Sequence, residues 1–288
     1  MAGFPAESFA MVYADPPFNT GKTQRRSTLQ TTRDPDGDRV GFQGVRYATS
    51  TAAEGISYGD SREDYLGFLR PRVLAAWRVL RADGTLYLHL DYREVHHVKV
   101  MLDEVLGRER FLNEIIWAYD YGARARRRWP AKHDNILVYV KDPARYHFDS
   151  SEVDREPYMA PGLVTPEKAA RGKLPTDVWW HTIVPTTGRE KTGYPSQKPE
   201  GIVRRMMVAS TREGDAVLDP FAGSGTTGAV ATRLGRRFVL VDESPAAIDV
   251  MRTRLAGVEI YGLPAREDSG RQGLTGDLGQ VADGLADG

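Results

Sequence analysis

One stretch near the end of the chain, Asp219 to Thr227, constrains the fold most strongly. The apolar residues before it, Ala216 to Leu218, predict a buried strand, and a helix of small residues is predicted from Thr226 to Leu234. Gly223 and Gly225 permit positive φ and remove side chains, so backbone N–H groups of the turn can approach a ligand closely. The stretch therefore predicts an α/β fold in which this turn forms a ligand-binding corner.

Residues around the corner narrow the class of ligand. A second apolar run, Phe238 to Val241, ends at Asp242, where strand–helix–strand nucleotide sites place a carboxylate against ribose hydroxyls. Gly228 keeps the turn in register with a GxGxxG pattern, so the glycines alone leave a nicotinamide-dependent oxidoreductase open. Asp219 would repel a pyrophosphate, and together with Phe221 it favours a cationic, amino-acid-bearing ligand. No Gly-Lys-Ser/Thr follows the turn, which excludes a P-loop.

Length and composition favour a single enzyme-sized unit. A chain of 288 residues can bury one large core, and one α/β domain with an insertion is the simplest arrangement. The chain has no cysteine, which excludes disulfides and thiolate metal sites. Its first residues lack a basic region followed by an apolar core, and no apolar run approaches the length of a membrane span. These features predict a cytoplasmic protein with no membrane partner.

Charge is balanced overall, with 39 basic and 39 acidic residues, so the net charge does not argue for a polyanionic partner. Acidic residues outnumber basic ones beyond Pro264, which leaves the rest of the chain mildly basic. This Gly/Asp/Ala-rich tail, residues 264–288, is predicted to be disordered.

A second motif lies near the start of the chain. The apolar run Phe9 to Ala14 is typical of a central parallel strand, and it ends in Asp15-Pro16-Pro17-Phe18. The prolines stop the strand and stiffen the backbone at its carboxyl end, where open α/β sheets bind ligands. A carboxylate and a carbonyl can accept the two hydrogens of an exocyclic amino group while an aromatic ring stacks on the base. Taken alone, the motif fits a proline-rich turn equally well.

Residues 19–60 are polar and lack a sustained period, which predicts a long mobile loop whose arginines either meet phosphates or stay solvated. A helix is predicted from about Ser61 to Leu80, and a buried strand from Thr85 to Leu90. His89 and Asp91, at the end of that strand, are predicted to line the site. Two such residues make no metal site, so no metal is predicted. The arginines of the loop are Arg25, Arg26, Arg33, Arg39 and Arg46.

Two β-rich segments, 111–119 and 135–141, are predicted to pair as a hairpin. The tip between them is basic and contains Trp129, a composition typical of a segment that grips a phosphate backbone or props the gap left by a base. Its candidate DNA-binding residues are Arg124, Arg126, Arg127, Arg128 and Lys132.

Residues 142–190 contain six prolines and weak helix and strand signals, which predicts an inserted lobe outside the sheet. A helix from Glu200 to Ser210 follows, and Lys198 at its entrance is a candidate for binding an anionic group. Another helix is predicted from Pro245 to Leu255, and a short strand over Gly257 to Tyr261.

Three motifs in this order resemble the amino-group DNA methyltransferases in the permuted order called the beta class. They are Asp15-Pro16-Pro17-Phe18, Tyr194-Pro195-Ser196-Gln197-Lys198-Pro199 and Asp219 to Thr227, and the resemblance covers most of the chain. It implies a Rossmann-like sheet of the S-adenosylmethionine-dependent methyltransferase type, mostly parallel with one reversed strand, plus an inserted irregular target-recognition region.

The resemblance also implies roles for individual residues. Asp15 and Pro16, with Pro17 beside them, would hold the target amino nitrogen of double-stranded DNA, and Phe18 would stack on the flipped base. Lys198 would meet the methionine carboxylate of S-adenosylmethionine, and Asp242 its ribose. The other cofactor-binding residues would be Asp219, Pro220, Phe221, Ala222, Gly223, Ser224, Gly225, Thr226 and Thr227.

On this resemblance the chain would divide into four parts. These are a catalytic half with the basic hairpin at 1–141, a target-recognition insert at 142–190, a cofactor-binding half at 191–263 and the tail. Family members usually carry one more strand upstream of the segment matching Pro5 to Phe9, ending in an acidic residue and followed by a helix that contacts the adenine of the cofactor. Either the chain starts too late for that strand, or the segment Val258 to Ile260 fills this edge of the sheet.

The leading hypothesis is methyl transfer to N6 of adenine, because an aspartate opens the catalytic motif. Members of the family that act on cytosine N4 more often open it with serine, and cytosine N4 is the alternative. A DNA-binding protein with an impaired cofactor site is a further hypothesis. A homodimer and a restriction endonuclease partner are left open by the sequence.

Overall fold

The structure is a computed structural model. It describes residues 1, 3–25, 28–37, 39–41, 44–53, 57–120, 125–185 and 187–257, and it describes their side chains except at 25, 28–31, 49–53 and 58. The edge strand expected near Val258 to Ile260, the acidic tail, Arg26 and Arg124 lie outside the described residues.

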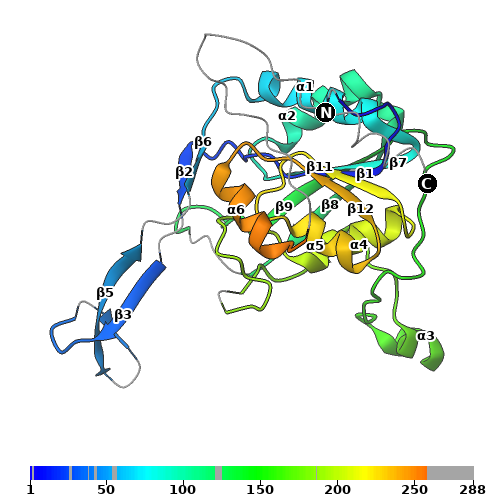
Figure 1. The fold of residues 1–288 in the computed structure, drawn as a ribbon. Coiled ribbons are helices and arrows are strands. Elements are labelled where there is room, and N and C mark those ends of the chain that lie inside the picture. Colours follow the sequence, from blue (N-terminus) through cyan, green and yellow to red (C-terminus); the bar gives the residue numbers. More distant parts are fainter. Residues whose placement is uncertain are drawn as a thin grey trace, which may run out of the picture.

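A seven-stranded sheet runs through the described part of the chain, with the strand order β10-β8-β9-β7-β1-β11-β12 (Figure 1). Neighbouring strands are parallel, except that β9 runs antiparallel to both β7 and β8. The prediction of a mostly parallel sheet with one reversed strand is therefore confirmed. The strands are β1 (Phe9–Ala14), β7 (Leu80–Leu90), β8 (Phe111–Ala118), β9 (His133–Val140), β10 (Val178–Trp180), β11 (Ala216–Asp219) and β12 (Arg237–Leu240).

Strand β1 lies between β7 and β11, and every residue of it is buried. Met11 is paired with Thr85 of β7 and with Val217 of β11. Because these three strands are parallel, their carboxyl ends meet at one edge of the sheet. The two motifs that are farthest apart in the sequence, after Ala14 and at Asp219, thus become neighbours.

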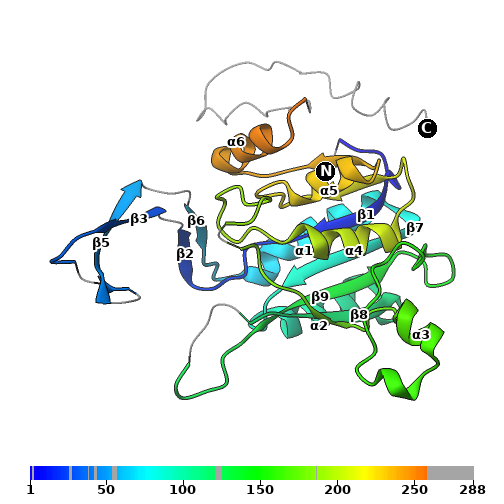
Figure 2. The same cartoon turned by 90° about the horizontal axis from the view of Figure 1, so that it is seen from below.

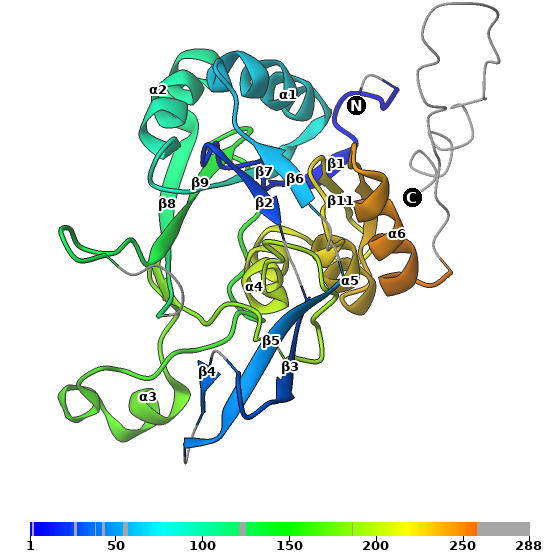
Figure 3. The same ribbon diagram turned by 90° about the vertical axis from the view of Figure 1, so that its left-hand side faces the viewer.

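Helices cover both faces of the sheet, in the three-layer arrangement expected for parallel strands (Figure 3). Alternate residues of β1 serve the two faces: Val12 packs in the cluster with α1 and α2, and Met11 in the cluster with α4 and α5. Helix α6 packs on the glycine corner through Ala247 and Met251. The helices are α1 (Tyr65–Val79), α2 (Val95–Leu106), α4 (Glu200–Ser210), α5 (Thr226–Arg233) and α6 (Pro245–Arg254).

The prediction of a long mobile loop over residues 19–60 is wrong. Strand β2 (Lys22–Arg25) pairs with β6 (Ser57–Asp60), and β5 (Arg46–Ala53) pairs with both β3 (Thr28–Arg33) and β4 (Arg39–Val40). Backbone hydrogen bonds hold these strands without the apolar alternation that marks a half-buried strand in sequence. We call the sheet formed by β3, β4 and β5 the arm; it projects from the body beyond β2 and β6 (Figure 1).

The prediction that residues 142–190 lie outside the sheet is wrong at one point. Residues Val178–Trp180 form β10, which pairs in parallel with β8 and is an edge strand of the described sheet. A strand of three residues is too short to produce a detectable pattern. Helix α3 (Pro166–Arg171) and the turns around it lie away from the sheet (Figure 2).

None of the helices in the described ranges combines the length and the apolar character needed to cross a membrane.

Candidate active site

A cavity of about 930 Å³ opens where β1, β7 and β11 end. Both sequence motifs, the catalytic one at Asp15 and the glycine corner at Asp219, line it. Because β9 runs in the opposite direction, its first residues reach the same edge, and Asp134 joins the lining. The sheet therefore brings chain segments from both ends of the sequence to one site.

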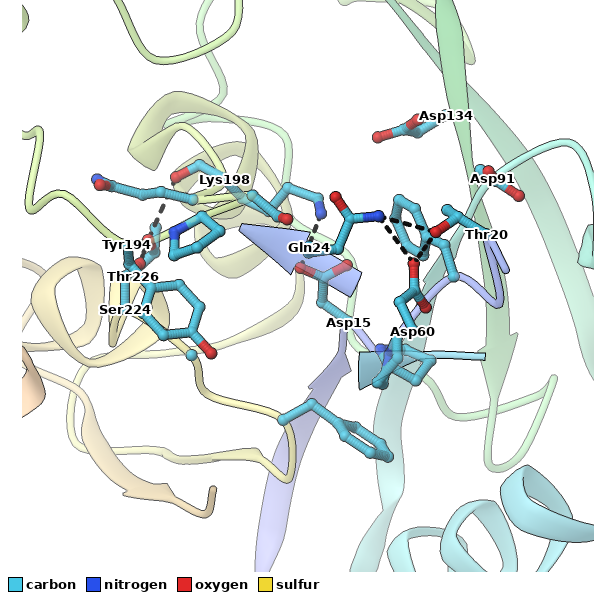
Figure 4. Close-up of a pocket in the computed structure, with 18 of the residues that line it drawn as sticks. Asp15, Thr20, Gln24, Asp60, Asp91, Asp134, Tyr194, Lys198, Ser224 and Thr226 are labelled. Carbon is cyan, nitrogen blue, oxygen red and sulfur yellow. Dashed lines mark hydrogen bonds and ion pairs between the residues drawn. The ribbon is translucent and has the colours of Figure 1, made fainter. Parts of the chain in front are cut away.

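Asp15 and Lys198 form an ion pair inside this cavity (Figure 4). The Nζ atom of Lys198 lies 2.9 Å from Oδ2 of Asp15 and 4.5 Å from the centre of the Phe18 ring. The other carboxylate oxygen of Asp15, Oδ1, is buried and has no hydrogen-bond partner among the described residues. A buried acceptor without a donor is costly, so Oδ1 is suited to accept a hydrogen from a ligand. The predicted contact of Lys198 with a cofactor carboxylate stays a prediction.

Asp219 stabilises the glycine corner by accepting two hydrogen bonds from it. Its Oδ2 accepts a hydrogen bond from the Thr227 hydroxyl at 2.5 Å, and its Oδ1 accepts one from the backbone N–H of Phe221 at 3.0 Å. Burial raises the pKa of Asp219 to about 7, although both hydrogen bonds oppose that shift. This carboxylate thus fixes the turn and the start of α5.

Asp242 ties the end of β12 to the same turn. Its Oδ2 accepts a hydrogen bond from the N–H of Gly223 at 2.8 Å, and its Oδ1 accepts one from the N–H of Ser244 at 2.9 Å. Burial raises its pKa, and these two backbone donors lower it. Gly223 has a positive φ of 49°, and a Cβ there would lie 3.1 Å from the Tyr194 ring, so the close approach requires glycine.

Gly225 differs in position from the rest of the predicted cofactor set, and its role toward the cofactor stays a prediction. All the other predicted cofactor residues line the cavity, but Gly225 does not. Its φ is 73°, and a Cβ there would lie 2.9 Å from Met251 of α6. The glycine is therefore needed for the packing of α6 against the corner. The lining residues among the predicted set are Lys198, Asp219, Pro220, Phe221, Ala222, Gly223, Ser224, Thr226, Thr227 and Asp242.

His89 lies behind the catalytic motif and not in the cavity lining. It is fully buried, with Nδ1 2.8 Å from the Tyr13 hydroxyl and Nε2 3.2 Å from Oδ2 of Asp134. Burial raises the pKa of Asp134, but the interactions with His89, Lys198 and Tyr119 together hold it below the usual value. The His89 ring lies 5.7 Å from the Phe18 ring, so this network supports the ring from behind. Asp91, the other residue predicted at this strand end, lines the cavity.

The basic tip between β8 and β9 lies next to the cavity. Arg126 and Arg127 are exposed, Arg128 is exposed and lines the cavity, and the Trp129 side chain is 95% exposed. Lys132 instead donates a hydrogen bond to the backbone oxygen of Asp120 at 2.8 Å, within the hairpin. The described part of the tip and the arm project on the same side of the molecule (Figure 2).

Several residues of the site were not found from the sequence. Asp134 is the second residue of the reversed strand β9, and Phe68 of α1 faces the Phe221 ring at 6.2 Å between centres. Asn19, Gln24 and Asp60 meet beside the catalytic motif. Each depends on a contact between segments distant in sequence, and no local pattern indicates it.

These features define the class of protein. A sheet of parallel strands with one reversed strand, a glycine corner after one central strand and an acid–proline–aromatic motif after its neighbour are the fold and site of a Rossmann-like methyltransferase. The chain belongs to the DNA methylase family, whose model matches residues 9–253.

Two relatives agree with this assignment. Type II methyltransferase M.HpaI of Haemophilus parainfluenzae is 31% identical over 208 residues, which cover 70% of this chain and 64% of the relative. DNA adenine methyltransferase YhdJ of Escherichia coli is 29% identical over 260 residues, or 87% of this chain and 77% of that protein.

Two solved structures share the fold. The PvuII DNA methyltransferase (cytosine-N4-specific) aligns with a TM-score of 0.59 and 17% identity, over 90% of this chain and 83% of that one. The complex of M1.HpyAVI with SAM aligns with a TM-score of 0.54 and 18% identity, over 88% of this chain and 98% of that one.

Proposed function

We propose that the protein is an S-adenosylmethionine-dependent DNA methyltransferase that methylates N6 of adenine in a flipped-out base. The observation that carries the proposal is that Asp15 and the Asp219–Thr227 corner line one cavity. One motif suits a base amino group, and the other suits a nucleoside bearing a cationic amino acid. The family membership supports this assignment.

On the base side, Oδ1 of Asp15 and the carbonyl oxygen of Pro16 accept the two hydrogens of the amino group. Lys198 occupies Oδ2 of Asp15, which leaves Oδ1 for the base. Phe18, supported by His89, stacks on the base. The target must leave the duplex because the methyl donor cannot reach an amino nitrogen inside the base stack.

On the cofactor side, S-adenosylmethionine supplies an electrophilic methyl group on a sulfonium sulfur. The corner residues and Asp242 hold the nucleoside, as the resemblance predicts. Hydrogen bonds to Asp15 and Pro16 favour a tetrahedral amino nitrogen whose lone pair points at the methyl carbon. With the cofactor bound, the N–C bond would form as the S–C bond breaks, releasing S-adenosylhomocysteine, and one proton of the amino group would pass to Asp15 or to water.

The choice of adenine rests on the aspartate that opens the catalytic motif. The name of the relative YhdJ, DNA adenine methyltransferase, supports it. Mass analysis of nucleosides from DNA treated with the protein and S-adenosylmethionine tests both the activity and the base. We expect N6-methyladenine. N4-methylcytosine as the sole product would overturn the choice of base, and no methylated nucleoside would favour a DNA-binding protein with an impaired cofactor site.

We also propose that the basic tip grips the DNA backbone through Arg126, Arg127 and Arg128, with Trp129 propping the gap left by the flipped base. Three exposed arginines beside the cavity provide the positive charge that phosphates require, and an exposed indole can stack on bases. Arg124 and Lys132 belong to the same predicted set. Residues 142–190 are proposed as the target-recognition region, because β10 within them pairs with β8, the first strand of the hairpin that carries the basic tip.

The type II methyltransferase names of several relatives support a role in restriction–modification, with a restriction endonuclease as partner. A homodimer and a cytoplasmic location belong to the same proposal. Methylome sequencing of a host with and without the gene would identify the methylated site. Cleavage of unmethylated DNA at that same site by host extract would identify the endonuclease, and resistance of such DNA would argue against one.

A further inference from the structure

Asn19 directly follows Phe18, and its backbone N–H and both polar atoms of its side chain form hydrogen bonds. Its backbone N–H donates to Oδ1 of Asp60 at 2.7 Å, its Nδ2 donates to Oε1 of Glu94 at 2.7 Å, and its Oδ1 accepts from the N–H of Arg62 at 2.7 Å. Its φ of 56° is in the left-handed region, which asparagine tolerates and most residues avoid. Such a conformation persists where neighbouring contacts determine it.

Asp60 accepts hydrogen bonds from several residues of the turn that follows the catalytic motif. Besides the N–H of Asn19, its carboxylate accepts hydrogen bonds from the Thr20 hydroxyl at 2.5 Å and from Nε2 of Gln24 at 3.1 Å, while its backbone oxygen accepts from the N–H of Gly21 at 2.9 Å. It is only 2% exposed, and a buried carboxylate must be satisfied in this way. In Figure 4 the Gln24 side chain lies between the Asp15–Lys198 pair and the pair formed by Thr20 and Asp60.

The same residue is the point where the arm joins the body. Asp60 ends β6 and is paired with Lys22 of β2, and these two strands lead into and out of the arm. Its carboxylate therefore links the base of the arm to the backbone that carries Phe18. A buried carboxylate with this many hydrogen bonds would be unnecessary if residues 19–60 formed only a surface loop.

We propose that Asn19 and Asp60 are positioning residues for methyl transfer, which hold Phe18 and the Pro16 carbonyl in the geometry that receives the base. This inference rests on the proposed function above. Neither residue is within the catalytic motif; each acts through the backbone of residues 15–19. Misplacement of a reacting group by about 1 Å costs up to roughly 100-fold in rate, so loss of these hydrogen bonds should mainly lower the rate of the chemical step.

The test compares Asp60→Asn with Asp215→Asn. Asp215 also anchors a loop with its carboxylate, through Arg81 at 2.7 Å and the N–H of Arg212 at 2.8 Å, but it precedes β11 and lies at the opposite end of that strand from the site. We expect Asp60→Asn to lower the single-turnover methylation rate by roughly 10- to 100-fold with unchanged affinity for S-adenosylmethionine. Asp215→Asn should leave the rate unchanged at temperatures where both variants are folded.

Asn19→Gly provides a second variant that keeps the positive φ accessible and removes only the side-chain bonds. Amide hydrogen exchange over residues 15–24 should be faster in Asp60→Asn and Asn19→Gly than in the wild type and in Asp215→Asn. This readout does not require methylation. Failure of the wild type to methylate DNA would contradict the proposed function alone, whereas unchanged exchange at 15–24 would overturn the positioning role whatever the activity. Equal rates for the two aspartate variants would overturn it as well.

Discussion

Asp15 and Asp219 follow neighbouring strands, yet their surroundings give them different tasks. Asp15 has one oxygen paired with Lys198 and one oxygen unpartnered among the described residues. Both oxygens of Asp219 accept hydrogen bonds from its own turn. The Asp15 carboxylate is therefore available to a ligand, whereas the Asp219 carboxylate stabilises the turn that forms the glycine corner.

We expect Asp15→Asn to lower the methylation rate by at least about 100-fold, because an amide places a donor where the base amino group needs an acceptor. Calorimetry should find nearly unchanged binding of S-adenosylmethionine. Asp142→Asn, which alters a partly exposed carboxylate paired with Arg145, is the matched control and should be fully active. Retained turnover in Asp15→Asn would remove Asp15 from the mechanism.

Asp219 should make the stability of the protein depend on pH. Its pKa of about 7 in the folded state exceeds the ordinary 3.8, so between these values the folded state holds a proton that the unfolded state has lost. The free energy of unfolding contributed by this group therefore falls as pH rises through this window.

Asparagine at this position cannot titrate. Between pH 5 and pH 8, Asp219→Asn should gain about 2 to 3 kcal/mol of stability relative to the wild type. Urea unfolding at several pH values, without cofactor, measures the difference. A constant difference across the range would show that Asp219 is ionised throughout.

At the scale of elements, the sequence predicted those parts that have an apolar pattern. The helix over Glu200–Ser210 has the predicted bounds, and the segments 111–119 and 135–141 pair as the predicted hairpin. The arm was missed because its strands are polar and have no core to face, so pairing leaves no period in the sequence. β10 was missed because three residues form no pattern at all.

The presence or absence of a local apolar pattern also explains which residues of the candidate site could be predicted from the sequence. Motifs that end a buried strand, such as Asp15 to Phe18, could be predicted because the strand itself is recognisable and its carboxyl end is where ligands bind. Asp60 and Asp134 depend on which segments meet, so the sequence gives no local sign of them. Gly225 was predicted from the resemblance to line the cofactor, which stays a prediction, while its contact with Met251 in the packing of α6 could not be seen in the sequence.

The basic tip makes a prediction for the hairpin as a unit. Replacing Arg126, Arg127 and Arg128 with glutamine should weaken DNA binding about equally for all sequences, because phosphate contacts carry no sequence information. It should also reduce the slope of log affinity against log salt concentration by about 2 to 3. Arg252→Gln on α6, an exposed arginine away from the cavity lining, is the control. Unchanged salt dependence in binding titrations would show that the tip does not contact DNA.

At the scale of the whole molecule, cofactor binding should stabilise the fold, because the cavity joins segments from both halves of the chain. S-adenosylmethionine at 100 times its Kd adds about 2.7 kcal/mol, and each kcal/mol raises Tm by roughly 2 to 4 °C for a protein approaching this size. NADH at the same concentration should leave Tm unchanged. A shift with NADH alone would revive the oxidoreductase hypothesis.

The position of β1 also affects how the protein is made. β1 is completely buried and lies inside the sheet between β7 and β11, but its partner β11 begins only at Ala216. During synthesis from the amino terminus, β1 can pair with β7 long before β11 has left the ribosome, and until then one apolar edge has no partner. Contacts between such distant segments slow folding. The nascent chain therefore carries its catalytic motif on an open sheet edge, and β11 can close that edge only after it has left the ribosome.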